Sequence, residues 1–365
     1  MPIRRLPIIG AIISLIGLWT VYSASYNSGM LWWEGVFGRQ LAWVGLGLAA
    51  MFLFSRFDYR RFYGLAFIFY GLSIVFLFVV LVFGRSRFGA QRWLDVFGLN
   101  FQPSELGKFS LVLLLARYYS EQGSSQVSWR IQQLGLWRSL IFPGILVAVP
   151  FALILHQPDL GTAIICGFIF LSLAFVAGVN KRQLFFLCAL AGLALPALWH
   201  LLRPYQKDRL LVFLNPNIDP LGAGYTIIQS KIAVGSGRLF GQGWLSGAQN
   251  RLDFLPERHT DFIFSCLAES CGFLGAVVLL LLFWLLLREC IRVIYSTRDP
   301  FARLLVSGIV AVISFQVLVN ISMTIGLMPV VGIPLPLVSY GGTSTLITFM
   351  SIGIVMSIAK NRVVF

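Results

Sequence analysis

The stretch PERHTDFIF, residues 256–264, places polar and charged side chains directly before a long apolar run that continues to Leu287. Asp261 stands just before that run, and Glu269 is the only charged residue within it. A carboxylate at the end of a membrane helix can serve as a general base, because a partly dry environment raises the pKa of a carboxyl group. Asp is also a preferred residue at helix N-termini. The position of Asp261 leaves both interpretations open, a base and a helix cap.

Glu269 follows Asp261 by a little over two helical turns, so we expect both side chains on about the same face of one helix. An ionisable side chain inside a membrane is costly, and this makes Glu269 a candidate for a functional role such as substrate binding. A structural pairing with a polar group on a neighbouring helix is the alternative.

Glu105 and Lys108 form a second pair of candidates at the start of another apolar stretch. Residues three apart are neighbours on a helix, so a simple ion pair would explain them. Lys108 also offers a point charge for a phosphate group, and Glu105 a second carboxylate beside Asp261. Asp261 and Glu105 together could also hold a divalent cation such as Mg²⁺ or Mn²⁺ through their oxygens. Two carboxylates are a weak signal, so this cation stays an alternative and no cofactor is otherwise predicted.

Basic and aromatic residues precede this pair: Arg92 and Trp93 follow Arg85 and Arg87. An arginine can bind pyrophosphate oxygens in a bidentate manner, and a tryptophan can stack on a sugar or anchor at the membrane interface. Contact with lipid headgroups is the alternative for the arginines. The remaining candidates for substrate binding are less distinctive, and they are Asp159, which also suits a helix cap, Arg209, Lys231, Ser339 and Tyr340.

The composition predicts the kind of scaffold that must position these side chains. Hydrophobic residues make up 58% of the 365 residues and charged residues only 12%, with a mean hydropathy of +0.84. A soluble chain of this length needs more charge to cover its surface. We therefore predict an all-α polytopic membrane protein that forms one integral domain over residues 1–365. Its net charge of +14 fits contact with membrane lipids and requires no nucleic acid.

Ten apolar stretches are long enough, or nearly so, to cross a membrane core of roughly 30 Å. Basic residues favour a cytoplasmic position for both termini, which places the candidate site residues outside. A long polar segment, 203–260, forms a large outer loop, in which 223–244 is expected to be a re-entrant or surface helix. Residues 128–139 are expected to lie on the inner membrane surface. The predicted spans are 7–25, 40–55, 63–83, 105–119, 139–156, 161–179, 183–202, 262–287, 304–328 and 344–359.

Irregular backbone is predicted just before the last span. The stretch PLPLVSYGGTS, residues 334–344, contains two prolines and two glycines and cannot be regular helix. Irregular backbone at membrane depth is tolerated where it lines a cavity. Ser339 and Tyr340 are therefore expected to face a cavity on the outer side.

Four motifs in this order resemble the SEDS family, the shape, elongation, division and sporulation proteins of the bacterial envelope. They are FGAQRWLDVFGLNFQPSELGK (88–108), QPDLGTA (157–163), PERHTDFIF (256–264) and NISMTIGLMPVVGIPLPLVSYGGTS (320–344). The resemblance spans nearly the whole chain and is greater to the elongation member of the family than to the division member. It implies ten helices with the large outer loop between the seventh and eighth, in the bacterial cytoplasmic membrane.

The same resemblance implies a peptidoglycan glycosyltransferase that polymerises lipid II into glycan strands with a class B penicillin-binding transpeptidase as partner. It matches Asp261 to the proposed catalytic residue. Such a reaction needs a base for the acceptor hydroxyl and cations at the pyrophosphate leaving group, and the residues above supply both types. A lipid II flippase and a non-catalytic scaffold for a transpeptidase are the alternatives, although no internal repeat typical of a transporter is evident.

Overall fold

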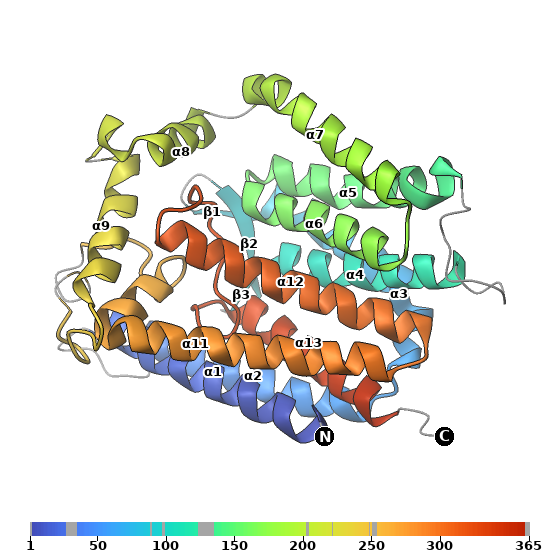
Figure 1. The fold of residues 1–365 in the computed structure, drawn as a ribbon, viewed down its shortest axis with the longest axis horizontal. Coiled ribbons are helices and arrows are strands. Elements are labelled where there is room, and N and C mark those ends of the chain that lie inside the picture. The colour runs from blue at the N-terminus through green and yellow to red at the C-terminus, as the bar shows by residue number, and fades with distance from the viewer. Residues whose placement is uncertain are drawn as a thin grey trace.

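The protein is a bundle of long helices, here described from a computed structural model (Figure 1). The described residues are 2–26, 35–87, 90–96, 99–122, 135–201, 204–220, 222–247, 249 and 254–361. The long helices are α1 (Pro2–Ser25), α2 (Val36–Arg56), α3 (Arg60–Phe83), α4 (Pro103–Gln122), α5 (Phe142–His156), α6 (Leu160–Val176), α7 (Lys181–Leu201), α11 (Ile263–Ser296), α12 (Pro300–Thr324) and α13 (Gly342–Lys360).

Each predicted span overlaps one of these helices, but the ends differ. The largest difference is in α11, which continues nine residues past the predicted end at Leu287, because the polar residues that follow stay helical beyond the apolar run. The predicted span 304–328 is shifted, since Asp299 caps α12 through the backbone N–H of Phe301 (3.1 Å) and the helix ends at Thr324.

Seven helical segments among the described residues are long and apolar enough to cross a membrane, and the chain is therefore a multi-pass membrane protein. They are α1, α2, α3, α11, α12, α13 and the combined segment Trp137–His156, in which a π-helix, η2 (Trp137–Ile141), leads into α5. Most of the predicted interfacial helix 128–139 lies outside the described residues. α6 is also apolar but has only 17 residues.

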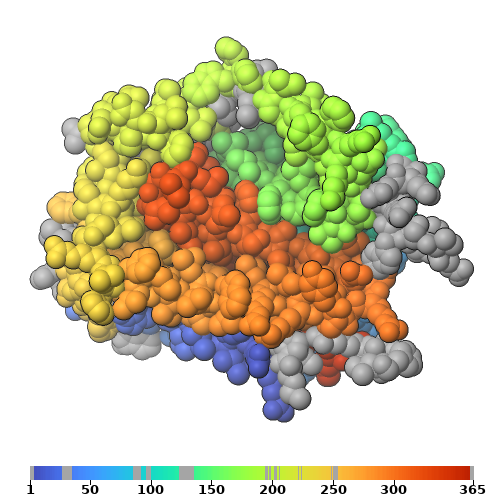
Figure 2. All heavy atoms as spheres, viewed as in Figure 1, coloured from blue at the N-terminus to red at the C-terminus, as the bar shows by residue number. Residues whose placement is uncertain are grey.

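The start of α1 and the end of α13 lie at one end of the bundle, and the segment between α7 and α11 lies at the other (Figure 1). The start of α1 and the end of α13 lie along the lower edge of Figure 1, right of its centre, whereas α8 (Pro204–Leu214) and α9 (Ala223–Ser236) lie at the left. α7 and α8 arch over the bundle, and Figure 2 shows a hollow beneath this arch. A short antiparallel sheet with strand order β1 (Arg85–Arg87), β2 (Ala90–Val96) and β3 (Leu99–Phe101) connects α3 to α4.

The segment between α12 and α13, residues 325–341, is irregular and is held by close approaches of two glycines. The prediction of irregular backbone over 334–344 is confirmed up to Gly341 and is wrong for 342–344, which form the first turn of α13. A Cβ on Gly17 of α1 would lie 2.7 Å from the backbone oxygen of Leu337, and one on Gly161 of α6 would lie 2.6 Å from that of Val331. Real side chains do not tolerate such contacts, so glycine permits α1 and α6 to pack directly on this segment.

Helix α11 is interrupted at Gly272, whose φ of 66° and ψ of −162° are not helical and favour glycine. Residues 238–243, which follow α9, form hydrogen bonds with the backbone groups that the interruption leaves free. These bonds join Phe273 N to Arg238 O (2.8 Å), Leu274 N to Leu239 O (3.1 Å), Gln242 N to Glu269 O (2.9 Å) and Gly243 N to Ser270 O (3.2 Å). The predicted helix in 223–244 is therefore α9 followed by turns packed on α11.

Candidate active site

A cavity of about 820 Å³ opens at the end of the bundle where α4, α6 and α13 begin. It brings together side chains that are far apart in the sequence and includes seven predicted site residues. The lining comprises Trp43, Arg92, Trp93, Asn100, Gln102, Glu105, Lys108, Thr162, Ile165, Arg209, Glu257, His259, Thr260, Asp261, Gly332, Ile333, Pro334, Tyr340, Gly341, Gly342 and Ser344.

Asp261 is held in this cavity by hydrogen bonds to the backbone of its own segment. The amide Nδ2 of Asn320 donates to the backbone oxygens of Asp261 (3.0 Å) and Ile333 (2.8 Å), which ties together the segments before α11 and α13. The N–H of Tyr340 donates to the oxygen of His259 (2.8 Å). These bonds fix the backbone and leave the Asp261 carboxylate directed to the cavity.

Asp261 is not the cap residue of α11, because the helix begins at Ile263 and Phe262 occupies the N-cap position. Burial raises the pKa of Asp261 to about 6, and the negative charge of Glu257 acts in the same direction. Arg209 and Arg92 oppose the shift by stabilising the carboxylate. A carboxyl group with such a pKa is a base at neutral pH and binds a proton more readily than an ordinary aspartate.

Lys108 and Glu105 form the ion pair that their spacing predicts, with Nζ 2.7 Å from Oε1. Lys108 is 2% exposed and Glu105 is 4% exposed, so the pair is almost fully removed from solvent. Each charge offsets the cost of burying the other. Both side chains still line the cavity, which places an ammonium group at its inner end.

Arg92 of β2 is fixed against the start of α6. Its guanidinium donates to the backbone oxygen of Pro158 and lies 3.7 Å from Oδ1 of Asp159. Asp159 caps α6, because its carboxylate accepts hydrogen bonds from the backbone N–H (3.2 Å) and the hydroxyl (2.9 Å) of Thr162. Asp159 is buried and is not part of the cavity lining, so the structure places it behind Arg92.

Besides Asp159, three predicted binding residues do not line the cavity. Lys231 of α9 lies against Gly326 after α12. Glu269 is buried, and its Oε1 accepts a hydrogen bond from the backbone N–H of Gln249 (2.9 Å), between α9 and α11. The expectation that Glu269 shares a helix face with Asp261 is wrong, because Asp261 precedes the helix. Ser339 donates to the oxygen of Thr260 (2.6 Å) and accepts from the N–H of Leu335 (2.8 Å).

Sequence reasoning missed two residues that position this site, Asn320 and Gln40. Gln40 of α2 donates to the oxygen of Ser339 (3.2 Å) and accepts from the N–H of Gly341 (3.3 Å), so it holds the segment that carries Tyr340. Both are polar side chains inside apolar helices, where a polar group needs a partner. This signal was available in the sequence.

Among the residues that the structure describes, no group of three or more His, Cys, Asp or Glu side chains could hold a metal ion. Glu105 is the carboxylate that would accompany Asp261 as a ligand, and it is already paired with Lys108. The arrangement supports proton transfer and anion binding better than cation binding.

The fold and the cavity define a class of protein, a multi-pass membrane protein with a cavity that holds a carboxylate together with cationic side chains. The family described as "Cell cycle protein", which comprises FtsW, RodA and SpoVE proteins, matches residues 4–363. The chain belongs to this family.

Two similar relatives are named as peptidoglycan glycosyltransferases. Peptidoglycan glycosyltransferase MrdB of Escherichia coli K12 is 40% identical over 329 residues, which is 90% of this chain and 86% of MrdB. Peptidoglycan glycosyltransferase RodA of Treponema pallidum is 32% identical and covers 94% of each chain.

Two solved structures share the fold. A chain in a structure described as the coordination of polymerization and crosslinking by a peptidoglycan synthase complex has a TM-score of 0.81 and 34% identity, over 98% of this chain and 97% of that chain. RodA of Thermus thermophilus, in a mutant with one aspartate replaced by alanine, has a TM-score of 0.72 and 32% identity, over 99% and 98%.

Proposed function

We propose that this chain, a peptidoglycan glycosyltransferase like its relatives, polymerises lipid II into glycan strands at the outer face of the bacterial cytoplasmic membrane during cell elongation. One observation carries the proposal: a single cavity holds Asp261, whose pKa is raised, together with the cationic side chains of Lys108, Arg92 and Arg209. A base and a set of cations are the two requirements for displacing a pyrophosphate with a sugar hydroxyl.

In the proposed reaction, Asp261 takes the proton of the acceptor hydroxyl as its oxygen attacks the anomeric carbon of the donor sugar. The new glycosidic bond forms while the bond from that carbon to the pyrophosphate oxygen breaks. The electron pair leaves with the polyprenyl pyrophosphate, where Lys108 and Arg92 stabilise the developing charge. Glu105 orients Lys108, and Trp93 and Tyr340 are placed to contact the sugars.

We further propose that the ten long helices each cross the membrane, with both termini in the cytoplasm and 203–260 outside. The start of α1 and the end of α13 lie at the same end of the bundle, which supports this arrangement (Figure 1). α4 carries buried charges and α6 is short, so these helices need the surrounding bundle to stay in the membrane.

The test of this topology uses a background with the native cysteines replaced by serine. A cysteine at the exposed Asn217 should react with an impermeant reagent from outside, and one at Ser296 only from inside. The reverse pattern would overturn the topology.

A class B penicillin-binding transpeptidase is the proposed partner. Support comes from the similar chain in a complex that coordinates polymerization and crosslinking. Because the glycan product must be crosslinked where it emerges, such a partner would contact the outer segments near the cavity.

The direct test is purified protein with labelled lipid II, alone and with a class B transpeptidase that has no transferase domain. Glycan chains that disappear in Asp261→Asn establish the proposed function. Movement of lipid II across the bilayer without chain formation would indicate a flippase. If neither occurs under either condition, the protein is a scaffold.

A further inference from the structure

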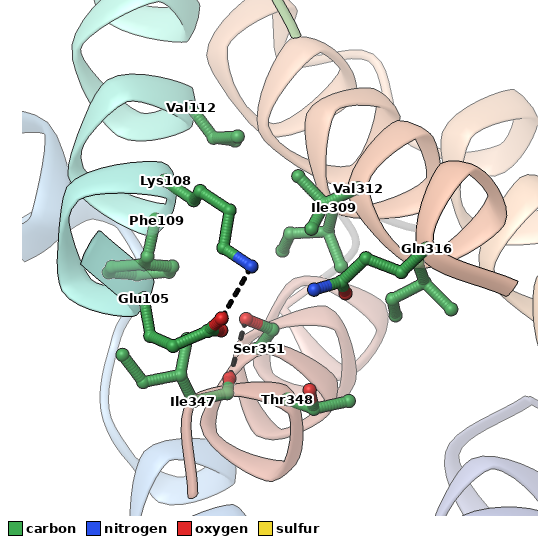
Figure 3. Close-up of a pocket in the computed structure, with 11 residues that line it drawn as sticks. Glu105, Lys108, Phe109, Val112, Ile309, Val312, Gln316, Ile347, Thr348 and Ser351 are labelled. Atoms are coloured by element: carbon green, nitrogen blue, oxygen red, sulfur yellow. Dashed lines mark hydrogen bonds and ion pairs between the residues drawn. The ribbon is translucent and has the colours of Figure 1, made fainter. Parts of the chain in front are cut away.

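Lys108 and Glu105 line not one cavity but two. Besides the large cavity, they border a small one of about 30 Å³, one to two helical turns further into α4, α12 and α13 (Figure 3). Most of its wall is apolar, but three other polar side chains contribute to it: Gln316, Thr348 and Ser351.

Gln316 presents a buried donor to this small cavity. It is 2% exposed, and its amide Nε2 has no hydrogen-bond partner among the described residues. In Figure 3 the amide nitrogen points to the space between Lys108 and Ser351. A buried donor without an acceptor is costly, so a group that accepts its hydrogen is expected in this space.

The hydroxyls of α13 present acceptors to the same space. Ser351 donates to the backbone oxygen of Ile347 (2.8 Å), and Thr348 donates to that of Ser344 (2.7 Å). Each hydroxyl hydrogen is thereby used, and the oxygen keeps a lone pair that can accept. The Lys108 ammonium carries three hydrogens, of which one is directed to Glu105.

These donors and acceptors select the chemistry of the occupant. An anion would meet the Glu105 carboxylate, and a cation would meet the Lys108 ammonium and the Gln316 amide. A water molecule both accepts and donates, and a polar cavity needs only roughly 10–15 Å³ and two to four partners to hold one. The volume and the partners here meet both conditions.

We propose that this cavity is a site for ordered water and that Gln316 is a positioning residue, which holds the Lys108 ammonium through that water. The water accepts from Nζ of Lys108 and from Nε2 of Gln316, and it donates to Ser351. With Glu105 and the water occupying two of its hydrogens, the ammonium keeps the third for the large cavity. The inference rests on the proposed role of Lys108 at the leaving group.

The first test is Gln316→Leu, which keeps the approximate volume of the side chain and removes the donor. The kcat of lipid II polymerisation is expected to fall roughly tenfold, the size expected for a weakened hydrogen bond to a charged group, with KM nearly unchanged. Ser314→Ala is the matched control, because Ser314 lies on the same helix, lines neither cavity and donates only to Ala311 (3.1 Å). A parent kcat in Gln316→Leu, or an equal loss in Ser314→Ala, would overturn the proposal.

The second test asks whether Gln316 acts through Lys108. The melting temperatures of the parent, Lys108→Met, Gln316→Leu and the double variant form a double-mutant cycle. Both variants with Lys108→Met contain the unpaired charge of Glu105, so its effect on the melting temperature cancels when the two are compared. If water joins the two side chains, Gln316→Leu should lower the melting temperature of the parent but not that of Lys108→Met. Equal effects in both backgrounds would mean that Gln316 is an independent structural residue.

Two outcomes separate this proposal from the role of Lys108 itself. If Lys108→Met polymerises like the parent, the leaving-group role fails, whatever occupies the small cavity. If Lys108→Met is inactive while Gln316→Leu is fully active, only the positioning role fails. A structure that shows ordered water between Lys108 and Gln316, lost in Gln316→Leu, is the direct evidence expected; a dry cavity would contradict it.

Discussion

The regular helix α4 holds Lys108 and Glu105 as a buried pair, whereas an irregular segment before α11 holds Asp261 by its backbone alone. In the first region two opposite charges fix each other, and their sum is neutral. In the second region, burial and the negative charge of Glu257 destabilise the ionised form of Asp261. Arg209 and Arg92 stabilise that form but only partly offset the effect. A charge that is paired is stable and immobile, while a charge without such a pair exchanges its proton near neutral pH. The cavity thus combines a fixed, paired ammonium group with a carboxyl group that titrates near neutral pH.

Asp261→Asn removes the base while keeping the shape of the side chain. A lost general base costs roughly 10²–10⁴-fold in rate, so lipid II polymerisation should nearly vanish. Asn is uncharged, so the variant escapes the cost of burying the Asp261 charge and should be at least as stable as the parent at neutral pH. Polymerisation and thermal unfolding measured side by side test this difference. A variant that keeps more than about a tenth of the parent rate would place the base elsewhere.

Lys108→Met removes the fixed cation. Loss of one group that stabilises transition-state charge costs roughly 10²-fold or more, and Lys108→Arg should keep part of the rate because it retains the charge. Lys108→Met also leaves Glu105 buried without its partner, which destabilises the fold. The double change Glu105→Gln with Lys108→Met restores neutrality and is the control. Recovery of activity in that double variant would show that Lys108 has only a structural role.

The pH dependence sharpens the contrast between the two regions. Because burial raises the pKa of Asp261 to about 6, the rate should fall about tenfold per pH unit below 6 and level off above it. The stability of the folded protein changes with pH in the opposite direction to the rate. The folded protein binds this proton more tightly than the unfolded chain, so the contribution of Asp261 to stability decreases as pH rises from about 4 to 6. Asp261→Asn should abolish this decrease, and a rate that is flat between pH 5 and 7 would contradict the assignment.

Asp159→Asn is expected to have the smallest effect on the rate of polymerisation, and it is the matched counterpart of Asp261→Asn. Asn also caps helices well, so α6 should keep its start while Arg92 loses a charged neighbour at 3.7 Å. Partly exposed ion pairs contribute roughly 0.2–1 kcal/mol, which corresponds to about a one- to fivefold loss of rate. Single-turnover measurements of polymerisation can resolve a loss of rate of this size. A loss as large as that of Asp261→Asn would mean that Asp159 contacts the substrate.

The sequence predicted the helices well because long apolar runs leave a membrane chain few choices. It also predicted which of its polar motifs would converge: Glu105 with Lys108, and Asp261 with Arg92, all line the cavity. Periodicity failed for Glu269, since the relation assumed a helix that in fact begins after Asp261.

Lys231 and Ser339 show the other limit of sequence reasoning. A polar residue in an outer segment can face a substrate or another part of the protein, and its type does not distinguish the two. Ser339 bonds to Thr260 and Leu335, and Lys231 lies on Gly326. Such roles depend on contacts between distant segments.

The interruption of α11 at Gly272 has a mechanical consequence. The two parts of α11, before and after Gly272, both share backbone hydrogen bonds with residues 238–243, so the interruption is joined to the segment that follows α9. A force on that segment would therefore shift the start of α11, and Asp261 with it, relative to Lys108 on α4. The separation of Asp261 and Lys108 therefore depends on contacts that lie outside the cavity.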